Sequence, residues 1–212
     1  MSNLNLNWIK ENFQDKDIVV FDIGCADMGD TVRIKEFIPY AVFYAFECAS
    51  VWYESNLKVA SAHNINYFHL ALSDVDGVQT FYPSDVYQGE AWPWSGSVCK
   101  PGEYLQSDMW KWGEGYNVPS ITLETFCNKH NVVPDFIHID VQGAEYKVFS
   151  KLGSIRPKCI WAEISEFTNY ETGIDYNTFH ELMVGYGYRQ LYKDNWDSLY
   201  VHKDLNCSDY TC

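Results

Sequence analysis

Near-continuous apolar runs alternate along this chain with segments in which apolar residues recur every three or four positions. The runs are typical of strands covered on both faces, and the wider spacing is typical of amphipathic helices. The runs predict strands at residues 18–23, 41–47, 65–71, 136–140 and 159–164, and two closing strands at 188–192 and 198–202. The spacing predicts helices at residues 3–14, 31–38, 51–63, 123–130, 145–152 and 176–186.

This order of strands and helices predicts an α/β fold of the Rossmann-like, doubly wound kind. We expect a mostly parallel seven-stranded sheet with an antiparallel closing strand and helices on both faces. The chain has 212 residues and shows neither an internal repeat nor a linker. We therefore expect one domain over residues 1–212, with an N-terminal helix within residues 1–16 and a polar tail at residues 203–212.

Residues 83–117 interrupt the alternation with several prolines and glycines and with Trp92, Trp94, Trp110 and Trp112. We expect a long irregular insertion here, lying over the carboxyl ends of the strands and preceded by an edge strand at residues 78–82. Long irregular segments in compact domains are usually functional or disordered, and the tryptophans argue against disorder. The rings either stack on a sugar or planar substrate, or form a lid with its own small core.

The first predicted strand ends at Asp22 and runs into a turn that contains Gly24 and Gly29, with a helix starting near Thr31. Open α/β sheets hold nucleotide-like ligands at such turns, because glycine lets the backbone approach the ligand and the helix offers free N–H groups. The alternative is a tight strand-to-helix turn without a ligand.

Glu47 ends the second predicted strand, where open α/β sheets bind the ribose of a nucleotide. A carboxylate can accept hydrogen bonds from both ribose hydroxyls. Otherwise Glu47 is a charged strand end that faces water. Ala71 and Leu72 follow the third predicted strand and are expected to reach the same cleft.

Composition narrows the range of partners. The net charge of −14 repels a nucleic-acid backbone, and no basic patch offsets it. Seven cysteines show no CxxC pair or zinc spacing, and several lie inside apolar runs, so we interpret these as small core residues in a reducing compartment. The chain has no signal pattern and no apolar run of about 20 residues, so we expect a cytoplasmic protein without a membrane span. Nothing in the sequence indicates an oligomeric state.

Two blocks of the sequence resemble one family. Residues 20–24 and 29–31, with residues 44–47, resemble the cofactor site of class I S-adenosylmethionine (SAM) methyltransferases. Residues 121–124 and 135–145 are similar to the signature of FkbM-type methyltransferases, and residues 71–74 and 95–97 sit where that family carries similar short segments. The resemblance covers roughly residues 18–202.

The sequence departs from that family at three places. The first turn is one residue longer than usual, and it carries Asp27 where Asn is common. The fourth strand carries His138 and Gln142 where the family usually has Lys and Glu. The departures concern the catalytic residues more than the cofactor site.

The resemblance implies SAM as cofactor and O-methylation of a sugar, a glycan or another small hydroxylated acceptor. It places the ribose on Glu47 and the methionine end at Gly24. The residues that it implies for cofactor binding are Asp22, Gly24, Asp27, Gly29, Glu47, Ala71, Leu72 and Asp140.

Asp140 is our first candidate for the general base, because it ends the strand beside which the transferring methyl would lie; Glu163 is the second. An ordinary carboxylate is a weak base for an alcohol, so it would need burial or a divalent ion shared by the two, although no metal pattern is indicated. His138 is the third candidate, and its alternative is a hydrogen-bonded core histidine. We expect Glu145 to hold the glycine turn or the helix start.

Two other functions stay open. A nicotinamide-dependent oxidoreductase uses the same layout, but the spacing of this turn is not Gly-x-Gly-x-x-Gly. A non-catalytic binding protein with a degenerate pocket would agree with the longer turn and with the substitutions in the fourth strand.

Overall fold

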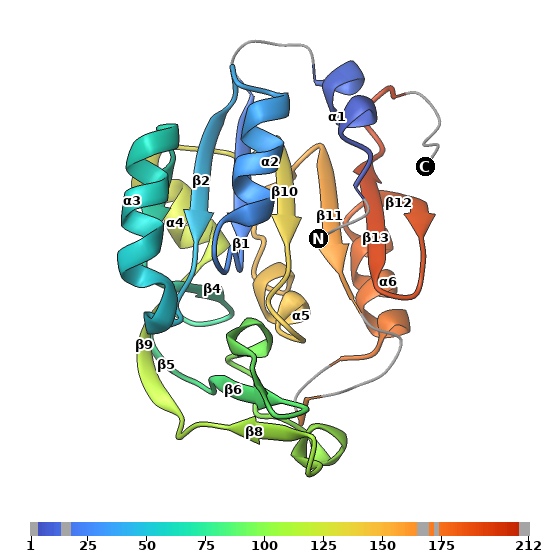
Figure 1. Ribbon diagram of the computed structural model, residues 1–212. Coiled ribbons are helices and arrows are strands. Elements are labelled where there is room, and N and C mark those ends of the chain that lie inside the picture. The colour runs from blue at the N-terminus through green and yellow to red at the C-terminus, as the bar shows by residue number, and fades with distance from the viewer. Residues whose placement is uncertain (1–3, 14–17, 165–169, 172–173, 208–212) are drawn as a thin grey trace.

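The computed structural model describes residues 4–13, 18–164, 170–171 and 174–207. Its centre is a seven-stranded sheet with the strand order β12-β13-β11-β10-β1-β2-β3 (Figure 1). Strand β13 is antiparallel to both of its neighbours, and all other pairs in this sheet are parallel. The expected fold class is therefore confirmed. The strands are β1 (Val19–Ile23), β2 (Val42–Phe46), β3 (Asn66–Phe68), β10 (Phe136–Ile139), β11 (Cys159–Glu163), β12 (Tyr188–Lys193) and β13 (Asp197–His202).

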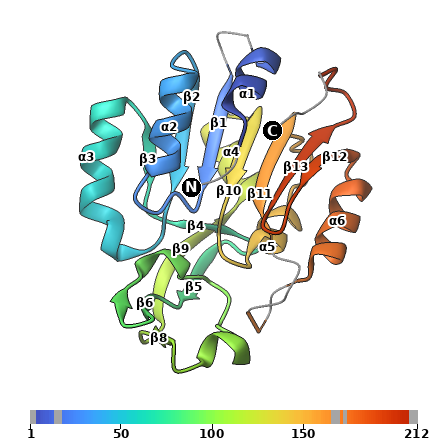
Figure 2. The ribbon, with the colours of Figure 1, turned by 45° about the vertical axis from the view of Figure 1, so that its right-hand side comes forward.

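Helices cover both faces of this sheet (Figures 1 and 2). One face packs against α1, α2 and α3, and the other packs against α4, α5 and α6. Both faces of the strands are thus buried, which explains the near-continuous apolar runs. All six predicted helices are present: α1 (Leu6–Asn12), α2 (Gly29–Phe37), α3 (Tyr53–His63), α4 (Leu123–His130), α5 (Glu145–Phe149) and α6 (Tyr176–Gly185).

A separate second sheet has the strand order β4-β9-β5, and its first strand follows β3 along the chain. It consists of β4 (Ala71–Ser73), β9 (Tyr116–Thr122) and β5 (Gly77–Phe81). The prediction of one strand over residues 65–71 was wrong. The ladder of the main sheet ends where the Glu47 amide donates to the Phe68 carbonyl at 3.2 Å, and Ala71 then begins a strand that pairs with β9.

Strand β9 was not predicted, because Pro119 argues against a central strand. Strand β4 pairs only with residues 120–122 of β9, and β5 pairs with residues 116–120. Pro119 therefore lies in the part of β9 that has one neighbour, where a missing N–H is tolerated.

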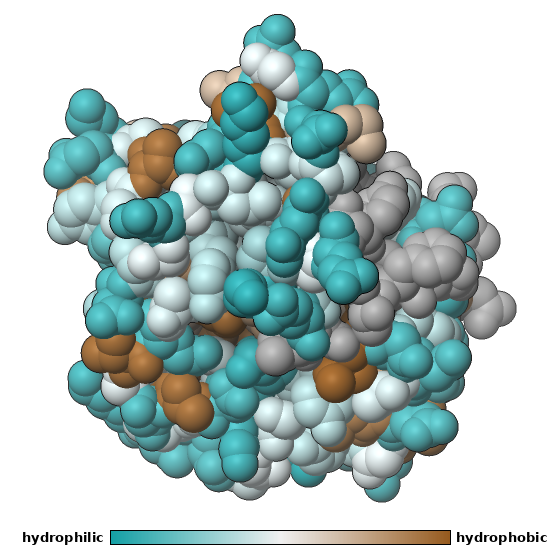
Figure 3. All heavy atoms as spheres, turned by 90° about the horizontal axis from the view of Figure 1, so that it is seen from below, coloured by the Kyte–Doolittle hydropathy of each residue, from teal (hydrophilic) through white to brown (hydrophobic). Residues whose placement is uncertain are grey.

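A third sheet, in the order β7-β6-β8, lies below the strand ends. It contains β6 (Ser84–Tyr87), β7 (Glu90–Ala91) and β8 (Trp110–Trp112), with the 3₁₀ turns η2 (Pro93–Ser95) and η3 (Glu103–Gln106) between them. Residues 83–117 are less irregular than expected, because the dense prolines and glycines masked these short strands. Seen from below, brown apolar residues on this face form separate spots between polar ones (Figure 3).

The third sheet is attached to the main sheet by a small core of its own. Buried Cys99, Leu105, Ala144 and Tyr170 form this core, and the tryptophans of β8 pack against it. The Tyr170 hydroxyl donates to the Ser95 carbonyl at 3.0 Å. The insertion is thus fixed to the segment that follows β11.

The remaining expectations concern the state of the cysteines, the polar tail and the absence of a membrane span. The six cysteines in the described ranges are free thiols, and five of them are buried. The end of the predicted polar tail, residues 208–212, lies outside the described residues. Within the described part of the chain, none of the helices combines the length and the apolar character needed to cross a membrane.

Candidate functional site

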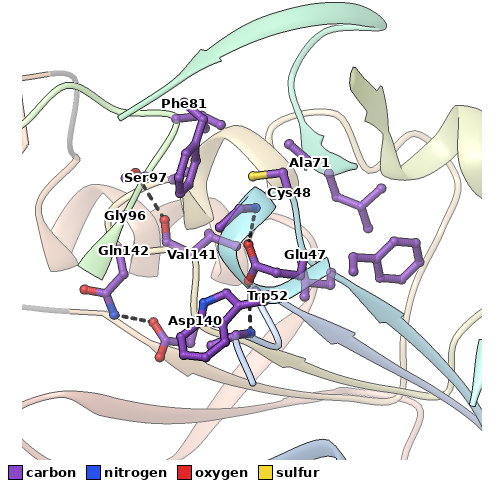
Figure 4. Close-up of a pocket in the computed structure, with 18 of the residues that line it drawn as sticks. Glu47, Cys48, Trp52, Ala71, Phe81, Gly96, Ser97, Asp140, Val141 and Gln142 are labelled. Carbon is purple, nitrogen blue, oxygen red and sulfur yellow. Dashed lines mark hydrogen bonds between the residues drawn. The ribbon is translucent and has the colours of Figure 1, made fainter. Parts of the chain in front are cut away.

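A pocket opens at the carboxyl ends of β1, β2 and β10, and the β4 strand and the η2 turn close its other side (Figure 4). It encloses about 690 Å³, including its open mouth. Its lining is apolar over much of its surface, with Glu47, Ser97, Asp140 and Gln142 as polar groups. Of the predicted cofactor residues, it brings together Gly24, Glu47, Ala71, Leu72 and Asp140.

Gly24 brings the ends of β1 and β10 into contact. Its φ is +82°, and a Cβ at this position would lie 1.9 Å from the Asp140 carbonyl oxygen. A side chain would therefore be excluded both by the left-handed backbone and by the neighbouring strand. This position requires glycine whether or not a ligand is bound.

The first turn contains two left-handed residues, Ala26 with φ 42° and Met28 with φ 65°. Such angles are uncommon for residues with a side chain. The buried Asn56 of α3 donates to the Ala26 carbonyl at 2.7 Å. The Ala26 amide in turn donates to Glu47 Oε2 at 2.9 Å. The longer turn is thus tied to α3 and to β2.

Three predicted cofactor residues do not line the pocket: Asp22, Asp27 and Gly29. Asp27 Oδ1 accepts from the amide of Gly29, the first residue of α2, at 2.9 Å. Asp22 is buried beneath the pocket and accepts from the Thr31 hydroxyl. The side chains of Asp22 and Asp27 thus stabilise the turn from outside the pocket.

His138 is also buried outside the pocket lining, and its Nδ1 lies 2.8 Å from Asp22 Oδ1. Burial lowers the pKa of His138, but the Asp22 carboxylate outweighs this effect and raises the pKa to about 9. The arrangement agrees with the alternative of a hydrogen-bonded core histidine.

Glu47 lies at the wall of the pocket with both oxygens held by backbone amides (Figure 4). Oε1 accepts from Ala49 at 2.7 Å, and Oε2 accepts from Ala26 at 2.9 Å. Burial raises the pKa of Glu47, and the amide donors counteract this. Because each carboxylate oxygen has two acceptor positions, Glu47 keeps acceptor capacity for a ligand.

Gln142 connects the two carboxylates that we predicted to be catalytic. Its Nε2 donates to Asp140 Oδ1 at 2.5 Å and lies 3.4 Å from Glu163 Oε1. Burial and then the Glu145 charge raise the pKa of Asp140 to about 7. Burial and then the Asp140 charge raise the pKa of Glu163 to about 8. Asp140 faces the pocket, whereas Glu163 is not part of its lining.

Glu145 has the structural position that we expected. Its Oε1 accepts from the amides of Val141 and Gly143 at 3.1 and 3.3 Å, so it holds the turn after β10. Ser97 fixes the same segment from the insertion, because its hydroxyl donates to the Val141 carbonyl at 3.2 Å. Gly96 and Ser97, which belong to one of the short family-like segments, line the pocket.

Two lining residues were missed by the sequence interpretation, Trp52 of η1 (Ser50–Trp52) and Phe81 of β5. Trp94 of η2, one of the tryptophans expected over the strand ends, also lines the pocket. Trp52 and Phe81 had no local signal, because their position depends on how the segments dock.

No group of three or more His, Cys, Asp or Glu side chains within the described ranges is placed to hold a metal ion. Asp140 and Glu163 share the amide group of Gln142 instead.

Comparison with known proteins gives three results. The family model described as "Methyltransferase FkbM domain" matches residues 22–190. The 2-O-methyltransferase NoeI of Sinorhizobium fredii (strain NBRC 101917 / NGR234) is 29% identical over 179 residues, covering 80% of this chain and 72% of NoeI. The crystal structure of methyltransferase FkbM from Methylobacillus flagellatus KT aligns with a TM-score of 0.51 at 12% identity. That alignment covers 88% of this chain but only 44% of the other, and it supports a likeness of fold alone.

Proposed function

Because the chain belongs to the FkbM family of methyltransferases, we propose that it transfers a methyl group from SAM to a hydroxyl oxygen of a sugar, a glycan or another small acceptor. The observation that carries this proposal is the position of Glu47 beside Gly24 and Asp140 in one pocket at the strand ends. The name of the Sinorhizobium relative, a 2-O-methyltransferase, supports oxygen as the acceptor atom.

The residues of the pocket fit the cofactor. The free acceptor positions of Glu47 suit the two ribose hydroxyls. Phe46, Ala71 and Leu72 offer an apolar wall for the adenine, and Gly24 leaves room for the methionine end. SAM supplies a methyl group on a positively charged sulfonium, and the acidic side chains around the pocket favour that charge.

The chain's own residues then align the acceptor and take its proton. Asp140 accepts the hydrogen bond of the acceptor hydroxyl and removes its proton during transfer. Its pKa of about 7 makes it a stronger base than an ordinary aspartate. Gln142 keeps the carboxylate oriented, and Glu163 behind it is the second candidate for the proton.

The first experiment is titration calorimetry with S-adenosylhomocysteine, with NADH as a parallel titrant. We expect micromolar binding of the first and no binding of the second. Glu47→Ala and Glu47→Gln should weaken binding about 10- to 100-fold, because hydrogen bonds to a charged group are lost. The control is Glu54→Ala on the exposed side of α3, which should bind normally. Binding of NADH alone would instead support an oxidoreductase.

The second experiment separates catalysis from binding. Turnover of the wild-type protein should rise with pH through about 7, as Asp140 loses its proton. Asp140→Asn should bind S-adenosylhomocysteine normally and lose about 100-fold in turnover. Full activity of this variant would remove Asp140 from the mechanism. Cofactor binding without methyl transfer to any acceptor would favour a non-catalytic binding protein.

We also propose the cytoplasm as the compartment. Buried free thiols such as Cys25, Cys48 and Cys159 are consistent with reducing conditions.

A further inference from the structure

A run of aromatic rings starts at the mouth of the pocket and continues across the third sheet. Trp52 and Trp94 both line the pocket, and their ring centroids are 5.5 Å apart. Trp92 follows at 5.2 Å from Trp94, and Tyr87 follows at 5.8 Å from Trp92. The rings therefore form a continuous path from the pocket to the outer surface.

The outer rings of this path are exposed, and Trp92 is held in place by hydrogen bonds. Trp94 is 44% exposed and Trp92 is 39% exposed. The Trp92 amide donates to the Asp85 carbonyl at 2.9 Å, and its Nε1 donates to the Ser95 hydroxyl at 3.0 Å. The Ser84 hydroxyl donates to the Trp92 carbonyl at 2.6 Å and accepts from the Ser95 amide at 3.0 Å. Exposed indoles held in this way lose little freedom when a ligand stacks on them.

The net negative charge of residues 83–117, which carry Trp92 and Trp94, restricts which ligands can bind to these rings. Acidic residues outnumber basic ones in residues 83–117, where Asp85, Glu90, Glu103, Asp108 and Glu114 stand against Lys100 and Lys111. The pocket lining contains no Lys or Arg. Phosphorylated, sulfated or nucleic-acid ligands would be repelled. A suitable ligand is neutral or cationic and has a flat apolar face.

The chemistry of the rings and of their acidic surroundings suits a sugar. Brown side chains on the face seen from below are separate spots rather than one continuous patch (Figure 3). A pyranose ring combines an apolar C–H face with hydroxyl groups at its edge. Indole rings suit the face, and nearby carboxylates such as those of Asp85 and Glu90 can accept from the hydroxyls.

We propose that Trp92 and Trp94 form the acceptor subsite and bind an uncharged or amino-sugar oligosaccharide that directs one hydroxyl into the pocket. This inference rests on the proposed function, since it names the acceptor class and its location. The planes of Trp92 and Trp94 meet at 65°, so successive sugar rings turn with respect to each other as they follow the path. Acceptors of two or more rings should therefore bind more tightly than a monosaccharide.

The test is a printed array of neutral, amino-sugar, sulfated and uronic-acid oligosaccharides, probed with the fluorescently labelled protein in the presence of S-adenosylhomocysteine. We expect binding to neutral or amino-sugar oligosaccharides and none to the anionic ones. The strongest array ligand is then titrated by calorimetry. Trp92→Ala should raise its Kd about tenfold or more, and Trp92→Phe should restore part of the affinity because a ring remains.

Trp196→Ala is the matched control, because Trp196 is 56% exposed in the turn between β12 and β13 and does not line the pocket. It should leave oligosaccharide binding unchanged, and the Trp92 variants should leave the Kd of S-adenosylhomocysteine unchanged. Absence of any neutral or amino-sugar ligand on the array, or equal losses in the Trp92 and Trp196 variants, would overturn the proposal. Oligosaccharide binding without cofactor binding would keep the subsite and reject the methyltransferase function.

Discussion

At the scale of single residues, Ala26 has an uncommon left-handed backbone in the first turn. A left-handed alanine costs roughly 1 kcal/mol relative to its ordinary conformation. Two hydrogen bonds hold it there, one from Asn56 and one to Glu47. Because the same Ala26 amide orients the carboxylate of Glu47, a distant amide side chain on α3 positions a residue of the cofactor pocket.

We predict that Asn56→Leu weakens S-adenosylhomocysteine binding about tenfold. Leucine has the same branching and number of side-chain heavy atoms, and Asn56 Oδ1 is buried without a hydrogen-bond partner among the described residues, so the change removes no bond of that oxygen. Adding Ala26→Gly should restore part of the affinity, since glycine adopts the left-handed angle without strain. Calorimetry measures the affinities and urea denaturation checks the fold. Normal affinity of Asn56→Leu would show that Glu47 does not depend on this contact.

At the scale of elements, the contact between the first turn and the end of β10 depends on one glycine. Gly24 allows the β1-to-α2 turn to lie against the Asp140 backbone. A side chain there would separate two neighbouring strands of the main sheet. The shape of the pocket and the pairing of β1 with β10 therefore both require glycine at position 24.

We predict that Gly24→Ala lowers the free energy of unfolding by about 3 kcal/mol or more, because it adds both a clash and a disfavoured backbone angle. Gly185→Ala is the matched control. Gly185 lies in α6, and a Cβ there would meet no atom within 4 Å. It should stabilise the protein by about 0.5–1 kcal/mol. Equal stability of the two variants in urea denaturation would contradict the close approach at Gly24.

The elements also explain how far prediction from sequence reached. Strands of the main sheet were predictable because burial on both faces leaves continuous apolar runs such as residues 136–139. Strands β4, β6 and β8 were not predictable, because their three or four residues mix polar and apolar side chains and form no apolar run. Gly24, Glu47 and Asp140 were predictable as strand-end residues. Trp52 and Phe81 were not, because no local pattern records which segments dock around the pocket.

At the scale of the whole molecule, buried titratable groups make stability depend on pH. Burial first, and then neighbouring carboxylates, raise the pKa of Asp140 to about 7 and that of Glu163 to about 8. Burial, opposed by amide donors, raises that of Glu145 to about 7. The Asp22 charge outweighs burial and raises that of His138 to about 9. Between its unfolded and its folded pKa, each of these groups is protonated in the folded protein and deprotonated in the unfolded chain.

We therefore predict that the free energy of unfolding falls as pH rises from about 5 to 9. The contribution of the carboxyl groups to the free energy of unfolding is fully present below their unfolded pKa values near 4. It is lost by about pH 8. The His138 contribution is complete below 6.5 and is lost through about pH 9. Urea denaturation at a series of pH values measures the slope, and Asp140→Asn should flatten its carboxyl part. A stability that rises with pH over this range would contradict the assignment.

The place of β1 in the middle of the main sheet has a consequence for how the chain folds. Contacts across β1 and β10 join residues 116 positions apart, as for Val19 with Asp135 and Asp22 with His138. Such pairing is slow, because a long loop must close before the contacts form. During synthesis the glycine turn emerges early but lacks its partner strand until residue 139 has left the ribosome. The ligand pocket is therefore completed late, and the newly made N-terminal half exposes apolar strands that chaperones can bind.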